Sequence, residues 1–322
     1  MPEWLVERGI GETRAALVQD GEILEARIEI DVTIPAGSVV EARLARLGAS
    51  GRNAIATCQG GTEFLLPTGA PGITQGATLA IEVTREAIPG AEPWKRPLAR
   101  VTDKPIQSLP PLAVRLGGRE LPFPAPRDEL AEAGWNDVLE EARTGSVTFA
   151  GGELSISPTP AMTLIDVDGH LLPEELATLG AAEAAKAIRR LDIGGSIGID
   201  LPTAGSKAAR RHAAEAIDEH LPRPFERTAV NGFGFLQIVR PRHRASLIEL
   251  AQLSPAFEAR VLLRRAAFAP PGPKRLVAHP AVAALLEGRP DWLNALSRHV
   301  GGAVGLRVDP ALPMSGGYAE SA

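Results

Sequence analysis

The alternation of apolar and polar residues in the first third of the chain predicts a series of β-strands. Residues 3–30 have the pattern of two alternating strands with a turn at Asp20-Gly21, a dipeptide that favours a tight hairpin. Five short alternating segments follow within residues 37–101, separated by stretches rich in glycine and proline. Strands this short and this closely spaced predict a small closed barrel, for which the OB-fold is the commonest choice at this size.

The middle of the chain mixes helical and strand patterns. Residues 103–127 are rich in proline and predict an irregular connector. After it the pattern predicts, in order, a helix over 126–144, strands in "SVTFAG" and "GELSISPT", a strand over 162–166, a helix over 173–191, a strand over 195–200, a helix over 206–221 that starts at Ser206, and a hairpin around Asn231-Gly232.

The last part of the chain is mainly helical up to "PPGPKR" (270–275) and then reads as strand, helix, helix and strand. We therefore expect an α+β multidomain protein. Its expected parts are an N-terminal hairpin that belongs to the core of the α/β domain (1–35), an OB-fold barrel (36–102), a connector and helix (103–145), the α/β domain itself with a mixed sheet (146–250), a helix and linker (251–275) and a small α+β domain (276–322).

Charge is unevenly distributed along the 322 residues. The net charge is −5, which argues against a protein that wraps nucleic acid nonspecifically. From Lys186 to Arg244, however, 11 Lys or Arg face 6 Asp or Glu, so this stretch carries a charge of +5. Such a stretch is either an ordinary solvated face or a local basic surface.

The chain has a single cysteine, Cys58, which excludes an internal disulfide and any site that needs two thiolates. It contains no run of 18 apolar residues and no charged-then-apolar leader. We therefore expect a cytoplasmic protein that does not enter the membrane.

The stretch "TLIDVDGH" (163–170) carries the most distinctive chemistry, because Asp166 and Asp168 follow an apolar run. The strand, helix and strand over 162–200 form a βαβ unit, so its two strands are expected to be parallel neighbours. Asp166 and Asp200 would then emerge at the same edge of the sheet. Neighbouring carboxylates repel each other unless a cation lies between them, and Mg²⁺ needs only one or two protein carboxylates. The sequence therefore predicts a Mg²⁺ site at Asp166 and Asp200, with Asp168 as a possible third ligand.

Other interpretations of these acids remain open. Each Asp could merely cap the turn that follows it. A calcium loop of the EF-hand type is excluded, because its later ligands are absent. "LIDVDGHLLP" also resembles the haloacid-dehalogenase phosphatase signature, which would make Asp166 a nucleophile and Asp168 a general acid. That signature normally has Thr where this chain has His170, and the later pair of acids that holds its metal is missing here.

Several segments, in order along nearly the whole chain, resemble the catalytic half of the RNase E/G endoribonucleases. They are "GETRAALVQDGEILEARIE", the barrel segment, "GELSISPTPAMTLIDVDG", "EAAKAIRRLDIGGSIGIDL", "NGFGFLQIVRPR" and "LVAHPAVAALL". The resemblance implies that Asp166 and Asp200 hold a catalytic Mg²⁺. It implies an endoribonuclease that cleaves single-stranded RNA with metal-activated water, leaving a 5′-phosphate and a 3′-hydroxyl. The alternative is an RNA-binding protein on the same fold with weak or lost catalysis.

The resemblance also implies RNA contacts. On the barrel these are Phe64, where a base could stack, and Lys95 and Arg96 beside Trp94. Near the expected metal site we predict a basic rim around the carboxylates, made of Lys207, Arg210 and Arg211 on one helical face and of Arg240, Arg242 and Arg244 at the end of the hairpin.

The chain departs from the family in places that matter for function. The family has Asn where this chain has Asp168, basic residues where it has "HLLPEE", and Arg where it has Gly232. The Cys-Pro-x-Cys link, through which relatives join two chains by zinc, is absent. We therefore expect no zinc and no zinc-linked dimer, and the sequence leaves the oligomeric state open.

Residues 103–145 are too few to hold the family's 5′-end sensing subdomain. We predict that cleavage of a 5′-monophosphorylated RNA is less than tenfold faster than cleavage of the matched 5′-triphosphorylated RNA. Initial rates on the two substrates test this prediction. A preference of tenfold or more would contradict it.

Overall fold

The computed structural model describes residues 1–89, 95–252 and 254–322. Its described residues form two compact units. The first unit comprises Met1–Val32, Leu112–Thr144 and Leu250–Ala322, and the second comprises Thr33–Pro111 and Gly145–Glu249. No helix in the described ranges has the length and apolar character needed to cross a membrane.

The first unit contains two sheets and six helices of its own among the described residues. One sheet has the order β3-β2-β1-β9 and the other the order β17-β16-β18. The strands are β1 (Glu3–Arg8), β2 (Glu12–Gln19), β3 (Glu22–Ile30), β9 (Arg119–Leu121), β16 (Lys274–Ala278), β17 (Val304–Val308) and β18 (Tyr318–Ser321). The helices are α1 (Leu112–Leu116), α2 (Glu129–Glu132), α3 (Trp135–Thr144), α7 (Pro255–Phe268), α8 (Pro280–Glu287) and α9 (Pro290–Val300), and a 3-10 turn covers Met314–Gly316.

The N-terminal sheet confirms the hairpin turn at Asp20-Gly21, where both residues have positive φ. The expectation of two strands over residues 3–30 is wrong, because a second turn at Gly9–Gly11 divides the first into β1 and β2. The connector is also more regular than expected. Its β9 pairs in parallel with β1, next to Gly118, where a Cβ would come within 2.8 Å of Trp4.

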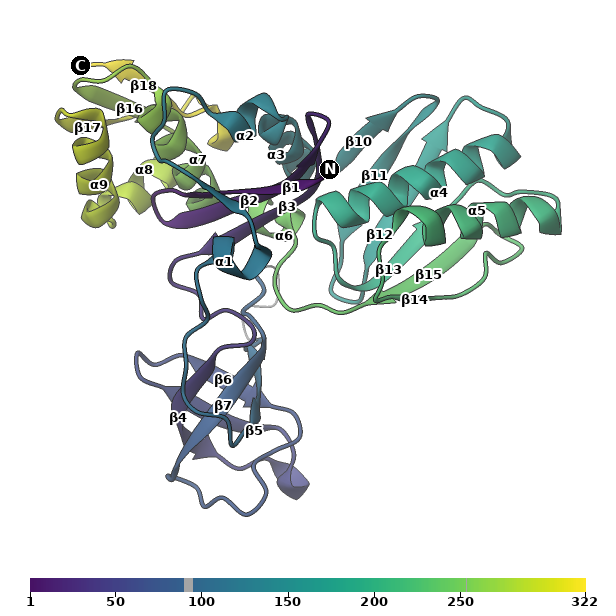
Figure 1. The fold of residues 1–322 in the computed structure, drawn as a ribbon, viewed down its shortest axis with the longest axis horizontal. Helices are drawn as coiled ribbons and strands as arrows, with labels where there is room; N and C mark the ends of the chain where they lie inside the picture. The colour runs from purple at the N-terminus through teal and green to yellow at the C-terminus, as the bar shows by residue number, and fades with distance from the viewer. Residues whose placement is uncertain (90–94, 253) are drawn as a thin grey trace. The chain divides into compact units, whose positions relative to one another are not determined.

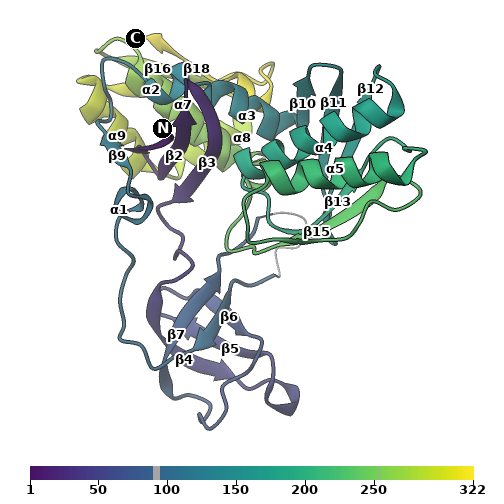
Figure 2. The same cartoon turned by 45° about the vertical axis from the view of Figure 1, so that its right-hand side comes forward.

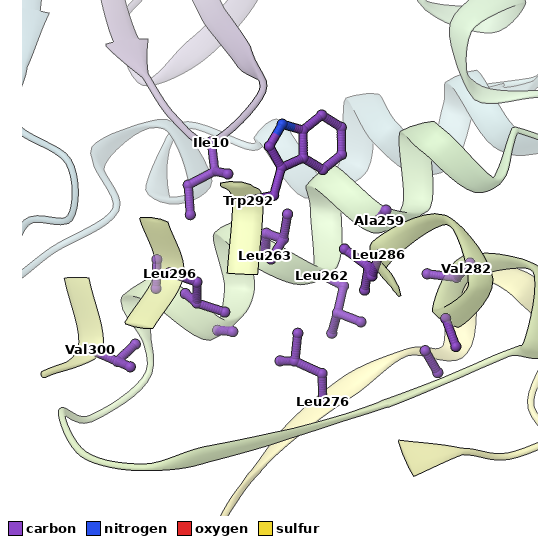
Figure 3. Close-up of a cluster of buried hydrophobic side chains, with 14 residues drawn as sticks. Ile10, Ala259, Leu262, Leu263, Leu276, Val282, Leu286, Trp292, Leu296 and Val300 are labelled. Carbon is purple, nitrogen blue, oxygen red and sulfur yellow. The ribbon is translucent and has the colours of Figure 1, made fainter. Parts of the chain in front are cut away.

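The main core of the first unit joins residues from both ends of the chain. Figure 3 shows Ile10, from the turn between β1 and β2, beside Trp292 of α9, with Leu262 and Leu263 of α7 in the same cluster. Gly11 has φ +76°, and a Cβ there would come within 2.4 Å of the Trp292 ring. The expected strand, helix, helix and strand over 276–322 are present, and they share this core with the N-terminal turn.

Buried ion pairs link the same segments. Glu12 on β2 accepts hydrogen bonds from Arg260 Nε at 2.9 Å and from Arg264 Nη1 at 3.0 Å, and all three side chains are buried. Arg14, one inward position further along β2, binds Glu7 through both carboxylate oxygens at 2.7 and 3.0 Å. Burial and the neighbouring Arg14 lower the pKa of Arg264 to about 10. Each buried guanidinium therefore depends on a carboxylate from another segment.

The second unit contains a closed barrel with the strand order β4-β5-β6-β8-β7, which confirms the barrel expected from the sequence. In this barrel, whose β4, β5, β6 and β7 are labelled in Figure 2, the strands wind around one another. They are β4 (Val39–Arg46), β5 (Ala54–Cys58), β6 (Glu63–Leu66), β7 (Thr78–Arg85) and β8 (Leu98–Val101), with a 3-10 turn at Ala49–Gly51. β4 pairs with both β5 and β7 in antiparallel fashion, and β6 pairs with β8 in parallel. Leu44, Leu66 and Ile81 fill the interior.

The rest of the second unit is a mixed sheet with the order β10-β11-β12-β13-β15-β14. Its strands are β10 (Ser146–Phe149), β11 (Gly152–Pro158), β12 (Thr163–Gly169), β13 (Gly195–Asp200), β14 (Glu226–Arg227) and β15 (Phe235–Arg240). α4 (Pro173–Arg190) and α5 (Lys207–His220) cover one face of this sheet, as Figures 1 and 2 both show, and α6 (Leu247–Ala251) follows it. The mixed sheet and the cap at Ser206, whose hydroxyl accepts from Ala209 N, agree with the sequence prediction.

Close packing decides which face the helices cover. Gly180 of α4 lies against Val167 of β12, where a Cβ would come within 2.3 Å of the valine side chain. Ile165 and Val167 are buried beneath α4, whereas Leu164, Asp166 and Asp168 are exposed on the opposite face. The sheet therefore has one helix-covered face and one open face.

We predict that Glu12→Ala lowers the free energy of unfolding of the first unit by about 3–5 kcal/mol, because it leaves Arg260 and Arg264 buried without a carboxylate. Urea titration followed by tryptophan fluorescence measures this effect in a Trp94→Phe background, since the other three of the four tryptophans, Trp4, Trp135 and Trp292, belong to the first unit. Glu129→Ala is the control. It breaks an exposed pair with Arg119 and is expected to cost less than about 1 kcal/mol. Equal losses in the two variants would refute a special role for the buried pairs.

Candidate active site

The two aspartates predicted from the sequence are direct neighbours in the sheet. β12 and β13 are parallel, and their register pairs Asp166 with Asp200. Paired residues on adjacent strands lie about 4.8 Å apart in the hydrogen-bonding direction. Their side chains emerge on the same, open face, and both residues are exposed. The βαβ unit therefore brings together two carboxylates that are 34 residues apart in the sequence.

The position of Asp166 along its strand differs from the expectation. Asp200 is the last residue of β13, as predicted, but β12 continues for three residues beyond Asp166, to Gly169. The strand extends because β11 keeps pairing with it, with Glu153 opposite Asp168 and Gly152 opposite Gly169. Asp166 thus lies on the open face of a continuous strand and does not begin a loop.

Asp168 lies on the same face as Asp166, two residues further along β12. At about 3.3 Å per residue, the two backbone positions are roughly 6–7 Å apart. Its register partner is Glu153 on β11, and Asp200 lies beside Asp166 on the other neighbouring strand. Within residues 1–89, 95–252 and 254–322, no three His, Cys, Asp or Glu side chains come close enough to hold one metal ion. Asp168 as a third ligand therefore stays a prediction.

The electrostatics of the pair suit a cation. Although Asp166 is exposed, partial loss of hydration next to the sheet raises the pKa of its carboxyl above the ordinary value, and the charges of Asp168 and Asp200 raise that pKa further. The same repulsion becomes attraction when a divalent cation lies between the carboxylates. Mg²⁺ takes oxygen ligands, keeps several waters and is often held by one or two carboxylates, so Asp166 and Asp200 fit it.

Of the basic residues expected around the carboxylates, only those of α5 lie near the end of β13 that carries Asp200, because α5 begins shortly after this strand. Lys207 is the first residue of α5; it is exposed and has no ion-pair partner in the part of the chain that the structure describes. Arg210 donates from Nη1 to the Ala204 and Gly205 carbonyls at 2.9 and 3.3 Å, so it supports the loop that follows Asp200. Arg211 lies 3.4 Å from Glu215.

The expected contribution of the hairpin arginines to a rim around the carboxylates is wrong. β15 runs antiparallel to β13, so Phe235 pairs with Asp200 whereas Arg240 pairs with Gly195. Arg240 is therefore five residues, or roughly 16 Å along the strand, from the Asp200 position. It donates to the Ile193 carbonyl at 3.1 Å, while Arg242 pairs with Glu249 and Arg244 with Asp192. These three arginines stabilise the opposite edge of the sheet, and contact with RNA there stays a prediction.

On the barrel, the expectation that Phe64 offers a stacking surface is wrong. Its side chain is 1% exposed and belongs to the barrel core, because strand alternation turns Phe64 and Leu66 inward. Arg96 forms an ion pair with Glu63 at 2.7 Å on the outer surface, and Lys95 is exposed. Trp94, which the sequence places beside them, lies outside the described residues.

Sequence reasoning missed the aromatic side of the site. Phe235 is the register partner of Asp200, and its ring lies against Gly198, where a Cβ would come within 2.7 Å of it. Leu164 contacts the same position, so Gly198 leaves room for two apolar side chains beside the carboxylates. The alternation in "FLQIV" (235–239) could have identified this residue. Leu236 and Ile238 are the apolar inward positions, so Phe235 belongs to the opposite face, which also carries Asp200.

Comparison of the sequence with protein-family models finds no matching family, and comparison with curated proteins finds no significantly similar one. We therefore infer the chemistry of the site from its own residues.

We predict that Asp200→Asn lowers the pKa of Asp166, because it removes a like charge that disfavours the ionised form. The pKa is expected to stay above its ordinary value, since partial loss of hydration is the larger cause. NMR titration of the labelled carboxyl carbons measures it, with Glu226→Gln on β14 as the control that leaves the Asp166 pKa unchanged. An unchanged pKa in Asp200→Asn would show that the two carboxylates do not interact.

Proposed function

We propose that this protein is a Mg²⁺-dependent endoribonuclease of the RNase E/G type that cleaves single-stranded RNA. The observation that carries this proposal is the in-register pair of Asp166 and Asp200 on the open face of the sheet. The charge of Asp200 raises the pKa of Asp166, and a cation between the two carboxylates would relieve this repulsion. The segments that resemble the family contain these same two residues. The single cysteine, Cys58, is free, and a chain without disulfides is compatible with a reducing cytoplasm.

In the proposed reaction Asp166 and Asp200 would hold the metal ion through their carboxylate oxygens. When bound, Mg²⁺ supplies an activated water and neutralises charge that develops on the phosphate. Binding requires both carboxylates to be ionised, so affinity for the metal is expected to fall as pH decreases through the raised pKa of Asp166. Exposed carboxylates on a sheet face suit a polymer that passes across the site better than a small enclosed substrate.

The surroundings of the pair support contact with a polyanion. The exposed Lys207 follows the loop after Asp200, and a lysine near a phosphate contributes to salt-dependent binding. α4 and α5 begin side by side, because Glu174 in the first turn of α4 accepts from the backbone N of Ser206 at 3.2 Å. The Glu174 carboxylate therefore already lies at the positive end of the α5 dipole, and Lys207 is the group there that favours a phosphate.

We assign RNA binding also to the barrel. Its strand order, with antiparallel closure of β4 on β7 and parallel pairing of β6 with β8, supports an OB-fold, which commonly binds single strands. Since Phe64 is buried, contacts would come from outward side chains. Arg100 and Lys104 are exposed and both form an ion pair with Glu82, so this group of three side chains carries a net charge of about +1.

The alternative of an RNA-binding protein without efficient catalysis is favoured by the loss of basic residues near the pair. This chain has "HLLPEE" where the family has basic residues and Gly232 where it has Arg, and Arg240 lies at the Gly195 end of β13. The phosphatase interpretation loses support from the course of β12. A nucleophile that opens a loop after its strand does not match Asp166, which lies within a strand that continues to Gly169.

We predict that the wild-type protein cleaves an end-labelled, A/U-rich single strand only when Mg²⁺ is present, and that Asp166→Asn and Asp200→Asn each reduce the rate at least about 100-fold. Gel analysis of the products and of their 5′-phosphate and 3′-hydroxyl ends tests this. Glu226→Gln, at the far edge of the sheet, is the control and should cleave at the wild-type rate.

Other results would reject the enzyme. Retention of RNA without cleavage by wild type would support the binding protein, and metal-dependent turnover of a generic phosphate monoester would support the phosphatase.

A further inference from the structure

Phe233 is unusually exposed for a large apolar side chain. Its exposed fraction is 84%, and among the large hydrophobic residues of the described ranges only Met1, at the start of the chain, is more exposed. Leaving a phenyl ring in water forgoes the roughly 1.5–3 kcal/mol of stabilisation that burying it would provide. An exposed ring is common enough on its own, so its meaning depends on how it is held and on what surrounds it.

The turn that carries Phe233 is held by several hydrogen bonds. The Asn231 Oδ1 accepts from the backbone N of Phe233 at 2.8 Å and from the backbone N of Phe235 at 3.0 Å, and Asn231 N donates to the Phe235 carbonyl at 3.0 Å. Gly234 has φ +95°, and a Cβ there would come within 2.0 Å of the Leu201 carbonyl. The backbone around the exposed ring is therefore fixed in position.

The same turn is attached to the strand end that carries Asp200. Leu201 N donates to the Gly234 carbonyl at 3.2 Å, and the Thr203 hydroxyl donates to the Phe233 carbonyl at 3.3 Å. Phe235, two residues after Phe233, is the register partner of Asp200 and covers Gly198 on the open face. Phe233 thus stands at the end of the sheet where the candidate metal ligand lies.

We propose that Phe233 stacks on an unpaired base of the RNA strand, next to the phosphodiester that lies at Asp166 and Asp200. This inference rests on the proposed function and names the structural feature by which the site selects single strands. A base can lie flat on the ring only when it has no pairing partner, and stacking on an aromatic side chain tolerates any base.

A nucleobase fits this position better than a protein partner. A single fixed ring matches the flat surface of one base, whereas a stable protein interface buries about 800 Å² on each partner. The loop that the turn contacts leads directly into α5, where the exposed Lys207 is available to a phosphate of the same strand.

The test measures RNA binding in the full chain with Asp200→Asn, so that cleavage does not interfere. Fluorescence anisotropy with a labelled single strand in Mg²⁺ is expected to show a roughly 5- to 150-fold weaker Kd for Phe233→Ala. Phe233→Leu, which keeps apolar surface without a ring, should weaken binding similarly, and Phe233→Trp should restore it. Because the side chain is exposed, the thermal unfolding midpoints of all variants should agree within a few degrees.

A scan with one abasic position at a time identifies the stacked base. With Phe233 present, one abasic position should lose most of the affinity, and with Phe233→Ala the same position should lose little. The proposal is overturned if Phe233→Leu binds as tightly as the parent, if the abasic effects are the same with and without the ring, or if the parent does not bind the single strand.

The two proposals fail in different ways. Loss of the stacking effect with intact cleavage by wild type would remove only the role of Phe233. Intact stacking with no cleavage by wild type would remove only the catalytic function.

Discussion

The in-register parallel pairing of β12 with β13 is the constraint on which the candidate site depends. It sets Asp166 beside Asp200, and α4 makes the crossover that parallel neighbours require. A shift of one residue in this register would turn one carboxylate toward α4 and leave an apolar side chain in its place. The contact of Gly180 with Val167 opposes such a shift, because only glycine lets the helix approach the strand this closely.

The asymmetry of the sheet gives the site its character. One face is apolar and covered by α4 and α5, and the other carries Asp166, Asp200 and Phe235 toward solvent. Because β15 runs antiparallel to β13, its aromatic and basic residues lie at opposite ends of the sheet. It leaves an aromatic residue at the Asp200 end and Arg240 at the Gly195 end, where the arginine caps the backbone carbonyl of Ile193.

The first unit shows a different use of charge. Glu12 and Glu7 lie on inward positions of adjacent strands, and each is matched by buried arginines from its own sheet or from α7. Buried charges that lose a partner are strongly destabilising, so these pairs specify how the N-terminal strands and α7 meet. In contrast to the carboxylates on the open sheet, these acids have internal cations and no need of a metal.

The local pattern of the chain was enough to predict most of the helices and strands and the pairing of the two aspartates. Strand spacing predicted the barrel, Ser206 predicted the start of α5, and the βαβ pattern predicted that Asp166 and Asp200 would meet, because these features depend on neighbours in sequence or on a single crossover. The sequence did not predict three outcomes: Phe64 is buried, Arg240 lies far from the carboxylates, and Phe233 stays exposed at the Asp200 end of the sheet. Those outcomes depend on which face of a strand meets its partner and on the direction of a return strand. The partners that decide both are distant in the chain.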